Sequence, residues 1–182
     1  MQTDLSIYNN SWYNPGKNRT IQLCWYFVNI LFFISPLNPF NQLKIQLLRL
    51  FGAKIGKGVV IKPGVNIKYP WRLLIGDYTW IGENVWIDNL DDVVIGSNCS
   101  ISQGAMLLCG NHNYKKEAFD LITKQIVLEE GVWVGTQSVI CPGVTLKSHA
   151  ILSVGSVATT DLDAYSIYQG NPAVKIRERI IE

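Results

Sequence analysis

His112 is the residue of this sequence best placed to act as a general base. It lies in the segment Asn111-His112-Asn113-Tyr114, where a regular repeat of six residues breaks off. A neutral imidazole can accept a proton near neutral pH. A loop histidine is by itself more often an exposed polar residue, so the position at the break is what favours catalysis. The second histidine, His149, stands at a turn of a regular repeat, and we interpret it as a surface residue.

Three carboxylates, Asp88, Asp91 and Asp92, precede this histidine. If positions twenty residues apart stack, as the repeat described below predicts, Asp92 lies beneath His112 and the other two lie on the same coil. A carboxylate at that place could bind a substrate hydroxyl or orient the imidazole. Aspartates also stabilise turns, so polar turn chemistry is an equal alternative.

Composition narrows the class of protein. The 182 residues are 48% hydrophobic, which fits one globular domain and excludes a disordered chain. The net charge is +2, without a run of Lys and Arg among aromatic residues, so we expect no nucleic-acid partner. No Cys-x-x-Cys pair is present, and we expect reduced thiols and a cytoplasmic protein. The four cysteines are Cys24, Cys99, Cys109 and Cys141.

A series of isoleucines predicts the elements that position these residues. They stand six residues apart, with two steps of eight, and the residue four places later is usually small. Glycine or Pro-Gly at the corners suits tight turns between short strands. Such a hexapeptide repeat indicates an all-β fold, a parallel β-helix whose early coils are twenty residues long. The isoleucines are Ile55, Ile61, Ile67, Ile75, Ile81, Ile87, Ile95 and Ile101, and after a break the series resumes at Leu128, Val134, Ile140, Leu146 and Leu152.

The repeat divides the chain into three regions. Residues 1–54 lack it and are expected to form a partly helical cap, with Leu43, Leu47 and Leu50 at helical spacing. Such a cap covers the unpaired edge of the first coil. The β-helix is expected over residues 55–162 with an inserted loop at 109–125, and a C-terminal tail over 163–182.

The apolar segment 23–34 has two interpretations. It is interrupted by Asn29 and followed by Pro36, so it is shorter than the roughly 20 residues of a membrane-spanning helix. We interpret it as a helix that packs on the β-helix. The alternative is a peripheral contact with the inner face of a membrane, because aromatic residues such as Trp25 and Phe27 favour that surface. The N-terminus has no secretory signal pattern.

Several motifs together resemble a known family, the hexapeptide-repeat acyltransferases, above all the acetyltransferases of the colanic-acid-biosynthesis type. The resemblance implies a left-handed β-helix, a homotrimer and acetyl-CoA bound between neighbouring subunits. The left hand is opposite to the one that the general rule for parallel crossovers favours. The motifs are Trp86-Ile87-Asp88-Asn89, Gly110-Asn111-His112, Gly131-Val132-Trp133-Val134-Gly135 and Gly170-Asn171-Pro172-Ala173.

The resemblance also implies roles for single residues. The reaction would be O-acetylation of a sugar hydroxyl in surface polysaccharide biosynthesis, with His112 as the base and Asp88 and Asp91 at the acceptor. Small outward residues would let acetyl-CoA lie along the wall, and cations near the C-terminus would meet its phosphates. The expected contacts with acetyl-CoA are Trp133, Gly135, Thr136, Ser153, Gly155, Lys175 and Arg177.

The sequence departs from the family pattern near these positions. The family commonly has lysine where Val174 and Thr160 stand, and an acidic residue where Asn113 stands. These differences concern the individual phosphate contacts more than the type of reaction.

Two other functions share this fold. A metal-dependent hydratase of the γ-carbonic-anhydrase type needs three histidines around zinc, and the chain has two, so we expect no metal. A non-catalytic scaffold would present a regular outward ladder, whereas the expected outward column is mixed. That column reads Val60, Trp80, Ser100, Trp133 and Ile151.

Overall fold

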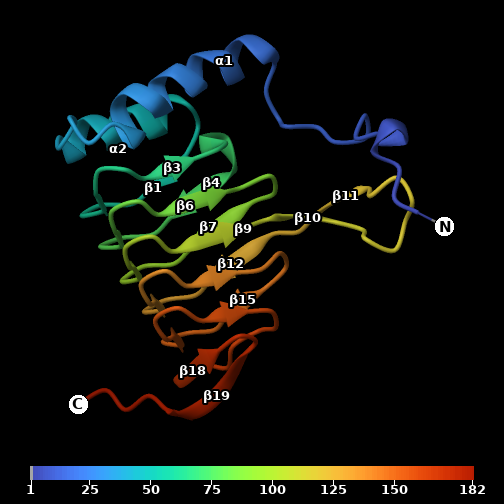
Figure 1. The fold of residues 1–182 in the computed structure, drawn as a ribbon. Helices are drawn as coiled ribbons and strands as arrows, with labels where there is room; N and C mark the ends of the chain where they lie inside the picture. Colours follow the sequence, from blue (N-terminus) through green and yellow to red (C-terminus); the bar gives the residue numbers. More distant parts are fainter. Residues whose placement is uncertain (1) are drawn as a thin grey trace.

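The computed structural model describes residues 2–182 as a stack of short parallel strands with helices at one end and the C-terminus at the other (Figure 1). Three sheets form the three sides of the stack, and the chain passes through them in the order A, B, C. The predicted all-β fold, a parallel β-helix with a helical cap and a projecting loop, is confirmed.

The strands are distributed over the three sides as follows. Sheet A contains β1 (Lys54–Ile55), β4 (Leu73–Ile75), β7 (Val93–Ile95), β12 (Ile126–Leu128) and β15 (Thr145–Leu146). Sheet B contains β2 (Val60–Ile61), β5 (Trp80–Ile81), β8 (Ser100–Ile101), β13 (Trp133–Val134), β16 (Ile151–Leu152), β18 (Ser166–Gly170) and β19 (Ala173–Glu178). Sheet C contains β3 (Asn66–Ile67), β6 (Trp86–Asp88), β9 (Met106–Leu108), β14 (Val139–Ile140) and β17 (Val157–Ala158).

The register of sheet A reproduces the spacing of the isoleucine series. Ile55 pairs with Ile75, and Ile75 with Ile95, each twenty residues on. Ile95 then pairs with Leu128 across the inserted loop, and Leu128 with Leu146. The inward positions are therefore fixed by the repeat, because side chains alternate between the two faces of a strand.

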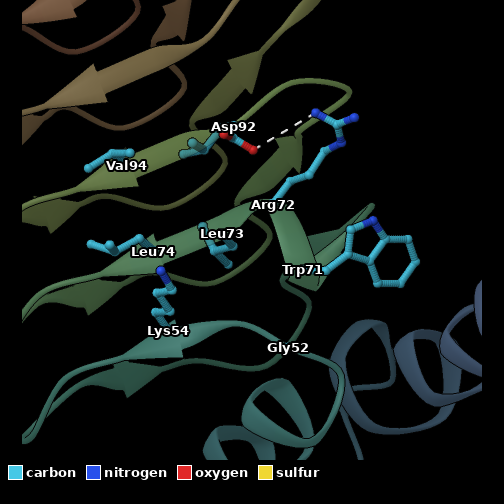
Figure 2. A pocket seen from close by; sticks show the side chains of 9 residues that line it. Gly52, Lys54, Trp71, Arg72, Leu73, Leu74, Asp92 and Val94 are labelled. Atoms are coloured by element: carbon cyan, nitrogen blue, oxygen red, sulfur yellow. Dashed lines mark ion pairs between the residues drawn. The ribbon is translucent and has the colours of Figure 1, made fainter. Parts of the chain in front are cut away.

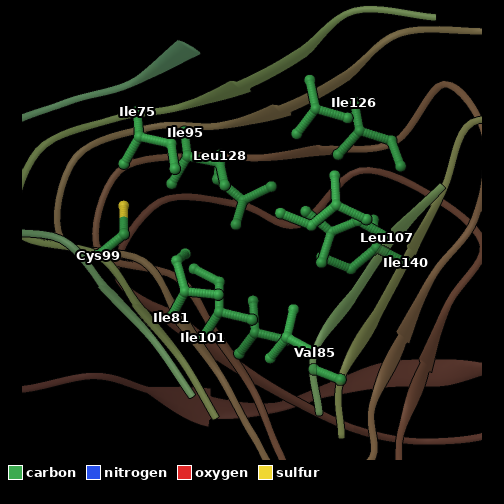
Figure 3. Packing of buried hydrophobic residues seen from close by; sticks show 14 of the residues in the cluster. Ile75, Ile81, Val85, Ile95, Cys99, Ile101, Leu107, Ile126, Leu128 and Ile140 are labelled. Atoms are coloured by element: carbon green, nitrogen blue, oxygen red, sulfur yellow. The ribbon is translucent and has the colours of Figure 1, made fainter. Parts of the chain in front are cut away.

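The aliphatic series forms one continuous core inside the stack (Figure 3). Ile75, Ile87, Ile95 and Leu128 are each exposed by 1% or less. Cys99 fills one of the small inward positions. The four cysteines are all free thiols.

The helical segments lie mostly in the cap. Asn18 caps the first long helix by accepting a hydrogen bond of 3.0 Å from the Ile21 N–H. No helix within residues 2–182 combines the length and the apolar composition that crossing a bilayer demands. The segments are the 3-10 turns η1 (Leu5–Ile7) and η3 (Pro70–Arg72), the α-helices α1 (Arg19–Val28) and α2 (Asn41–Leu50), and the π-helical segment η2 (Asn29–Ile34).

Polar side chains of the cap pair with the open edge of the first coil. The Asn41 side chain donates to the carbonyl of Val59 at 2.8 Å and accepts from the N–H of Ile61 at 2.7 Å. The Trp25 indole donates to the carbonyl of Ile67 at 2.8 Å. Backbone groups that would otherwise lie unpaired beneath the helices thus have partners.

Helix α2 packs through a side that only partly matches the leucine spacing, since Leu43 and Leu47 are half-buried. Ile45 and Leu48 are buried, whereas Leu50 is 78% exposed. Lys44 is also fully buried, and its ammonium donates to the carbonyl of Ile61 at 3.3 Å. Burial lowers the pKa of Lys44. The side of α2 that faces inward is therefore the one whose polar side chains can form hydrogen bonds with the open backbone groups of the first coil.

The C-terminal residues add two strands to sheet B. β18 continues the parallel stack on β16, and β19 returns antiparallel beside β18. The segment 163–182 thus completes the end of the stack opposite the cap, as Figure 1 shows.

Candidate active site

A β-hairpin projects from the corner between sheets C and A. It consists of β10 (Gly110–His112) and β11 (Leu121–Thr123), and it leaves the stack after β9 and rejoins it at β12. His112 is the last residue of β10 and pairs with Leu121. In Figure 1 the hairpin extends sideways towards the N-terminal segment.

The hairpin fixes the orientation of the His112 ring. Nδ1 lies 2.8 Å from the carbonyl oxygen of Phe119, and the two aromatic rings stack with centroids 4.5 Å apart and an interplanar angle of 8°. Phe119 has a positive φ of 51°, which turns its carbonyl back across the hairpin. A carbonyl oxygen can only accept a hydrogen bond, so Nδ1 carries the proton and a neutral ring has its lone pair on Nε2.

The N-terminal segment contacts the same hairpin. The N–H of Asp4 donates to the carbonyl of Glu117 at 3.0 Å, and the ring of Tyr8 lies 5.9 Å from that of His112. Sequence reasoning missed these contacts, because residues 1–18 carry no repeat and no motif that could pair them with the loop.

The aspartates of the underlying coil pair with cations. Asp88 lies 2.9 Å from the ammonium of Lys68, close to the base of the hairpin, because its Oδ2 is 3.8 Å from where a Cβ of Gly110 would be. Asp91 and Asp92 lie 3.7 Å and 3.9 Å from the guanidinium of Arg72, and Figure 2 shows Arg72 directed towards Asp92. The partner on Nδ1 of the imidazole is thus a backbone carbonyl and not a carboxylate.

A groove on sheet B gathers five of the seven residues that the sequence assigns to acetyl-CoA. Its volume is about 320 Å³. Arg177 lines the groove from β19 and provides a cation among apolar walls. The lining consists of Trp133, Gly135, Thr136, Ile151, Leu152, Ser153, Val154, Ile167 and Arg177.

Close approach of neighbouring coils explains the glycine in this groove. A Cβ on Gly135 would lie 2.5 Å from the backbone nitrogen of Val154, so a larger residue would force the coils apart. The indole of Trp133 donates to the hydroxyl of Ser102 at 3.0 Å, which holds the ring against the wall.

Two of the expected acetyl-CoA contacts lie outside the groove lining. Gly155 stands at the neighbouring corner with a φ of 65° and open space beside it. Lys175 forms an ion pair of 2.7 Å with Glu178 on the same strand. The pairing with Glu178 raises the pKa of Lys175.

The groove and the histidine lie on different parts of one chain. The groove follows sheet B to the corner between sheets B and C, whereas His112 projects from the corner between C and A. One side of a coil is about six residues long at roughly 3.3 Å each, which separates the two corners by roughly 20 Å. One chain therefore does not bring His112 and the groove together.

Three further features concern the scaffold and hydratase alternatives and the second histidine. The outward column Val60, Trp80, Ser100, Trp133, Ile151 is in register along sheet B, and it is not a ladder of like residues. Within residues 2–182, no three His, Cys, Asp or Glu side chains are arranged to hold a metal ion. His149 lies at a turn with a φ of 61°, stacked on Tyr165 at 4.8 Å.

Comparison with known proteins identifies relatives over most of the chain. A scan against models of protein families gave no match. A protein of Escherichia coli (strain K12) that is provisionally named colanic acid biosynthesis acetyltransferase WcaF is 39% identical over 168 residues, 92% of each chain. The galactoside O-acetyltransferase of the same organism is 27% identical over 136 residues, which cover 73% of this chain and 67% of that protein.

A solved structure has the same fold. It is a hexapeptide-repeat-containing acetyltransferase from Vibrio cholerae O1 biovar eltor in complex with acetyl coenzyme A. The match has a TM-score of 0.79 at 23% identity and covers 89% of this chain and 88% of that chain. Together with the identity to WcaF over nearly the full length, this fold shows that the chain belongs to the hexapeptide-repeat acetyltransferase family.

Proposed function

We propose that the protein transfers the acetyl group of acetyl-CoA to a hydroxyl group of a sugar, with His112 as the general base, in the biosynthesis of a surface polysaccharide. The observation that carries the proposal is the hydrogen bond of 2.8 Å between Nδ1 of His112 and the carbonyl of Phe119. It leaves Nε2 as the basic nitrogen of a ring that is held in place. Membership of an acetyltransferase family, with relatives named for colanic acid biosynthesis and for galactosides, supports the reaction type.

The reaction needs no acyl-enzyme. Nε2 of His112 accepts the hydroxyl proton as the acceptor oxygen attacks the thioester carbon, and the carbon–sulfur bond then breaks. Coenzyme A leaves as a thiolate, which the imidazolium can protonate, so the base returns to its neutral form. A base within hydrogen-bond reach contributes roughly 10² to 10⁴ in rate.

The sheet B groove is the proposed site of acetyl-CoA. Its small residues Gly135, Thr136 and Ser153 leave space along the wall for an extended pantetheine arm, and Arg177 supplies a positive charge for phosphate. A solved relative holds acetyl coenzyme A. Gly155 and Lys175 remain candidate contacts beyond the groove, where the cofactor would extend.

A homotrimer resolves the separation between base and groove. In a threefold assembly with parallel stacks, the hairpin of one subunit can reach the groove of the next, so each site combines two chains. We propose that Asp88 and Asp91 contact the sugar from the coil below the hairpin. Asp88, half-buried at the hairpin base, is the better placed of the two.

The test measures release of free thiol from acetyl-CoA with soluble galactosides and other sugars as acceptors. His112→Ala is expected to lower kcat by about 10² to 10⁴. His149→Asn is the matched control, because asparagine tolerates the positive φ at that turn and His149, stacked on Tyr165, lies on the regular stack and not on the hairpin that carries His112. A His112→Ala trimer with wild-type activity would refute the assignment.

A further inference from the structure

The cap exposes a continuous apolar face. Residues at spacings of three and four along α1 and η2 lie on one side of the helical segment, and each is more than one third exposed. The opposite side packs on the β-helix through the buried Trp25 and Phe33. We call the exposed side the docking face, and it comprises Leu23 (58%), Tyr26 (57%), Phe27 (54%), Ile30 (37%), Leu31 (60%) and Ile34 (40%).

This face differs from ordinary exposed hydrophobic residues. Single exposed leucines are common, but a contiguous apolar patch marks an interaction surface. The sequence has no charged residue from Thr20 to Leu43. Leu37 and Phe40, in the loop that follows, are 88% and 68% exposed and extend the apolar surface.

The charge of the cap indicates which kind of surface the docking face would bind. Residues 1–54 contain five basic side chains, of which Lys44 is buried, and one acidic side chain, a net charge of +4. The whole chain carries +2, which leaves −2 for residues 55–182. Lys17 and Arg19 are exposed at the start of α1, and Arg19 lies one turn before Leu23 on the docking face. Apolar and aromatic residues next to cations complement a surface of anionic lipids.

We propose that the docking face binds the surface of an anionic phospholipid bilayer, with α1 and η2 lying in the plane of the interface. Phe27 and Leu31 would enter the boundary between headgroups and acyl chains, and Lys17 and Arg19 would meet lipid phosphates. The twelve residues of segment 23–34 are too few to cross a bilayer, for which about 20 are needed.

A groove connects this face with the candidate active site. It has a volume of about 360 Å³ and runs between the α1–η2 segment and sheet C. Tyr26 and Ile30 line it on the helical side, and Lys68 and Asp88 line it on the sheet side. Asp88 adjoins Gly110, two residues before His112. If the proposed function holds, a saccharide that reaches this groove from the membrane side arrives at the base of the catalytic hairpin.

Vesicle co-sedimentation of the full-length protein tests the proposal. The probes are phosphatidylcholine vesicles with and without phosphatidylglycerol. We expect binding to the anionic vesicles that weakens with added salt. The double variant Phe27→Ser/Leu31→Ser should bind at least about tenfold more weakly, because two large apolar side chains no longer enter the lipid. Lys17→Glu/Arg19→Glu should reduce binding to the anionic vesicles alone.

The matched control is Ile180→Ser/Ile181→Ser. These residues are 85% and 54% exposed at the opposite end of the stack, so their loss should leave vesicle binding unchanged. Circular dichroism and the acetylation of a soluble sugar check that the Phe27→Ser/Leu31→Ser variant is folded and active. Loss of vesicle binding by a variant whose circular dichroism spectrum matches that of the wild type supports the proposal. Equal binding by wild type and variant, or a change of oligomeric state in place of lipid binding, overturns it. Neither result depends on whether acetyl transfer to sugars is itself observed.

Discussion

The ring of His112 is oriented by a backbone carbonyl and a stacked aromatic ring, and not by a carboxylate. Phe119 contributes both the carbonyl that accepts from Nδ1 and the ring that stacks on the imidazole. The carbonyl oxygen accepts the Nδ1 proton without placing a negative charge beside the ring, and it selects the tautomer whose lone pair is on Nε2. This arrangement suits a base that must be neutral before each turnover.

Phe119→Ala is expected to loosen the ring without removing it. We predict that kcat falls about tenfold and that KM for acetyl-CoA is unchanged, because none of the residues that line the sheet B groove is altered. Nitrogen NMR should find His112 with its proton on Nδ1 in the wild type and a mixture of tautomers in the variant. Tyr114→Ala, a 76% exposed aromatic of the same hairpin, is the control. Full kcat with an unchanged tautomer in Phe119→Ala would contradict a positioning role.

A buried thiol gives a second prediction for a single residue. Burial raises the pKa of Cys109 to about 12, above the usual 9.0 of an exposed thiol. The unfolded chain therefore loses this proton first, and the stabilising contribution of the neutral thiol is lost progressively from pH 9 towards pH 12. Between pH 7 and about pH 10, we expect the free energy of unfolding of the wild type, measured in urea, to fall by about 1 kcal/mol more than that of Cys109→Ala. If the free energies of unfolding of the two proteins change with pH in the same way, burial of the Cys109 thiol does not have this effect.

At the scale of elements, the cap replaces the hydrogen bonds that a preceding coil would supply. The Asn41 side chain takes the place of a strand of a preceding coil. Its amide donates to the carbonyl of Val59, the residue before β2, and accepts from the N–H of Ile61 in β2. An unpaired buried backbone group costs about 1–3 kcal/mol.

Asn41→Ala should therefore lower the free energy of unfolding by about 2 kcal/mol or more, because two backbone groups lose their partner. Gln42→Ala, at an exposed neighbouring position of α2, should change it by less than about 0.5 kcal/mol. Chemical denaturation of both variants measures the difference. Equal stability of the two would show that water replaces the amide at this edge.

The regular coils could be predicted from the sequence, whereas the contacts of the hairpin could not. The isoleucine series fixes which side chains point outward on each coil, so residues such as Trp133, Thr136 and Ser153 could be assigned to one wall in advance. The contacts of the hairpin follow no period, so neither the carbonyl of Phe119 nor the ring of Tyr8 could be predicted. The spacing of twenty residues places Arg72 beside Asp92, where the structure has an ion pair. The expected position of Asp92 beneath His112 is wrong, because Val93 pairs with Ile126 and the hairpin carries His112 out of the stack.

At the scale of the whole molecule, the proposed base His112 and the proposed acetyl-CoA groove belong to different sides of the stack. A mixture of two inactive variants tests whether sites combine two chains. His112→Ala removes the base, and Ser153→Trp fills the groove. In randomly mixed trimers of equal amounts, a site is intact when one subunit supplies His112 and the next supplies Ser153, which occurs at about a quarter of the sites.

We therefore expect that refolding the two variants together restores about a quarter of wild-type activity, although each alone is inactive. Mixing without unfolding should restore none, and this serves as the control. An inactive refolded mixture that still contains trimers would mean that base and groove act within one chain.

The stack has a direction, with the cap at one end and β19 at the other. If the stacks associate side by side, rotation about a threefold axis parallel to them places all three docking faces at the same end. Three weak contacts then act as one, because the second and third form at high local concentration. Avidity of this kind makes residence on a bilayer depend steeply on assembly, so that a lone subunit leaves the surface quickly and the complete enzyme stays.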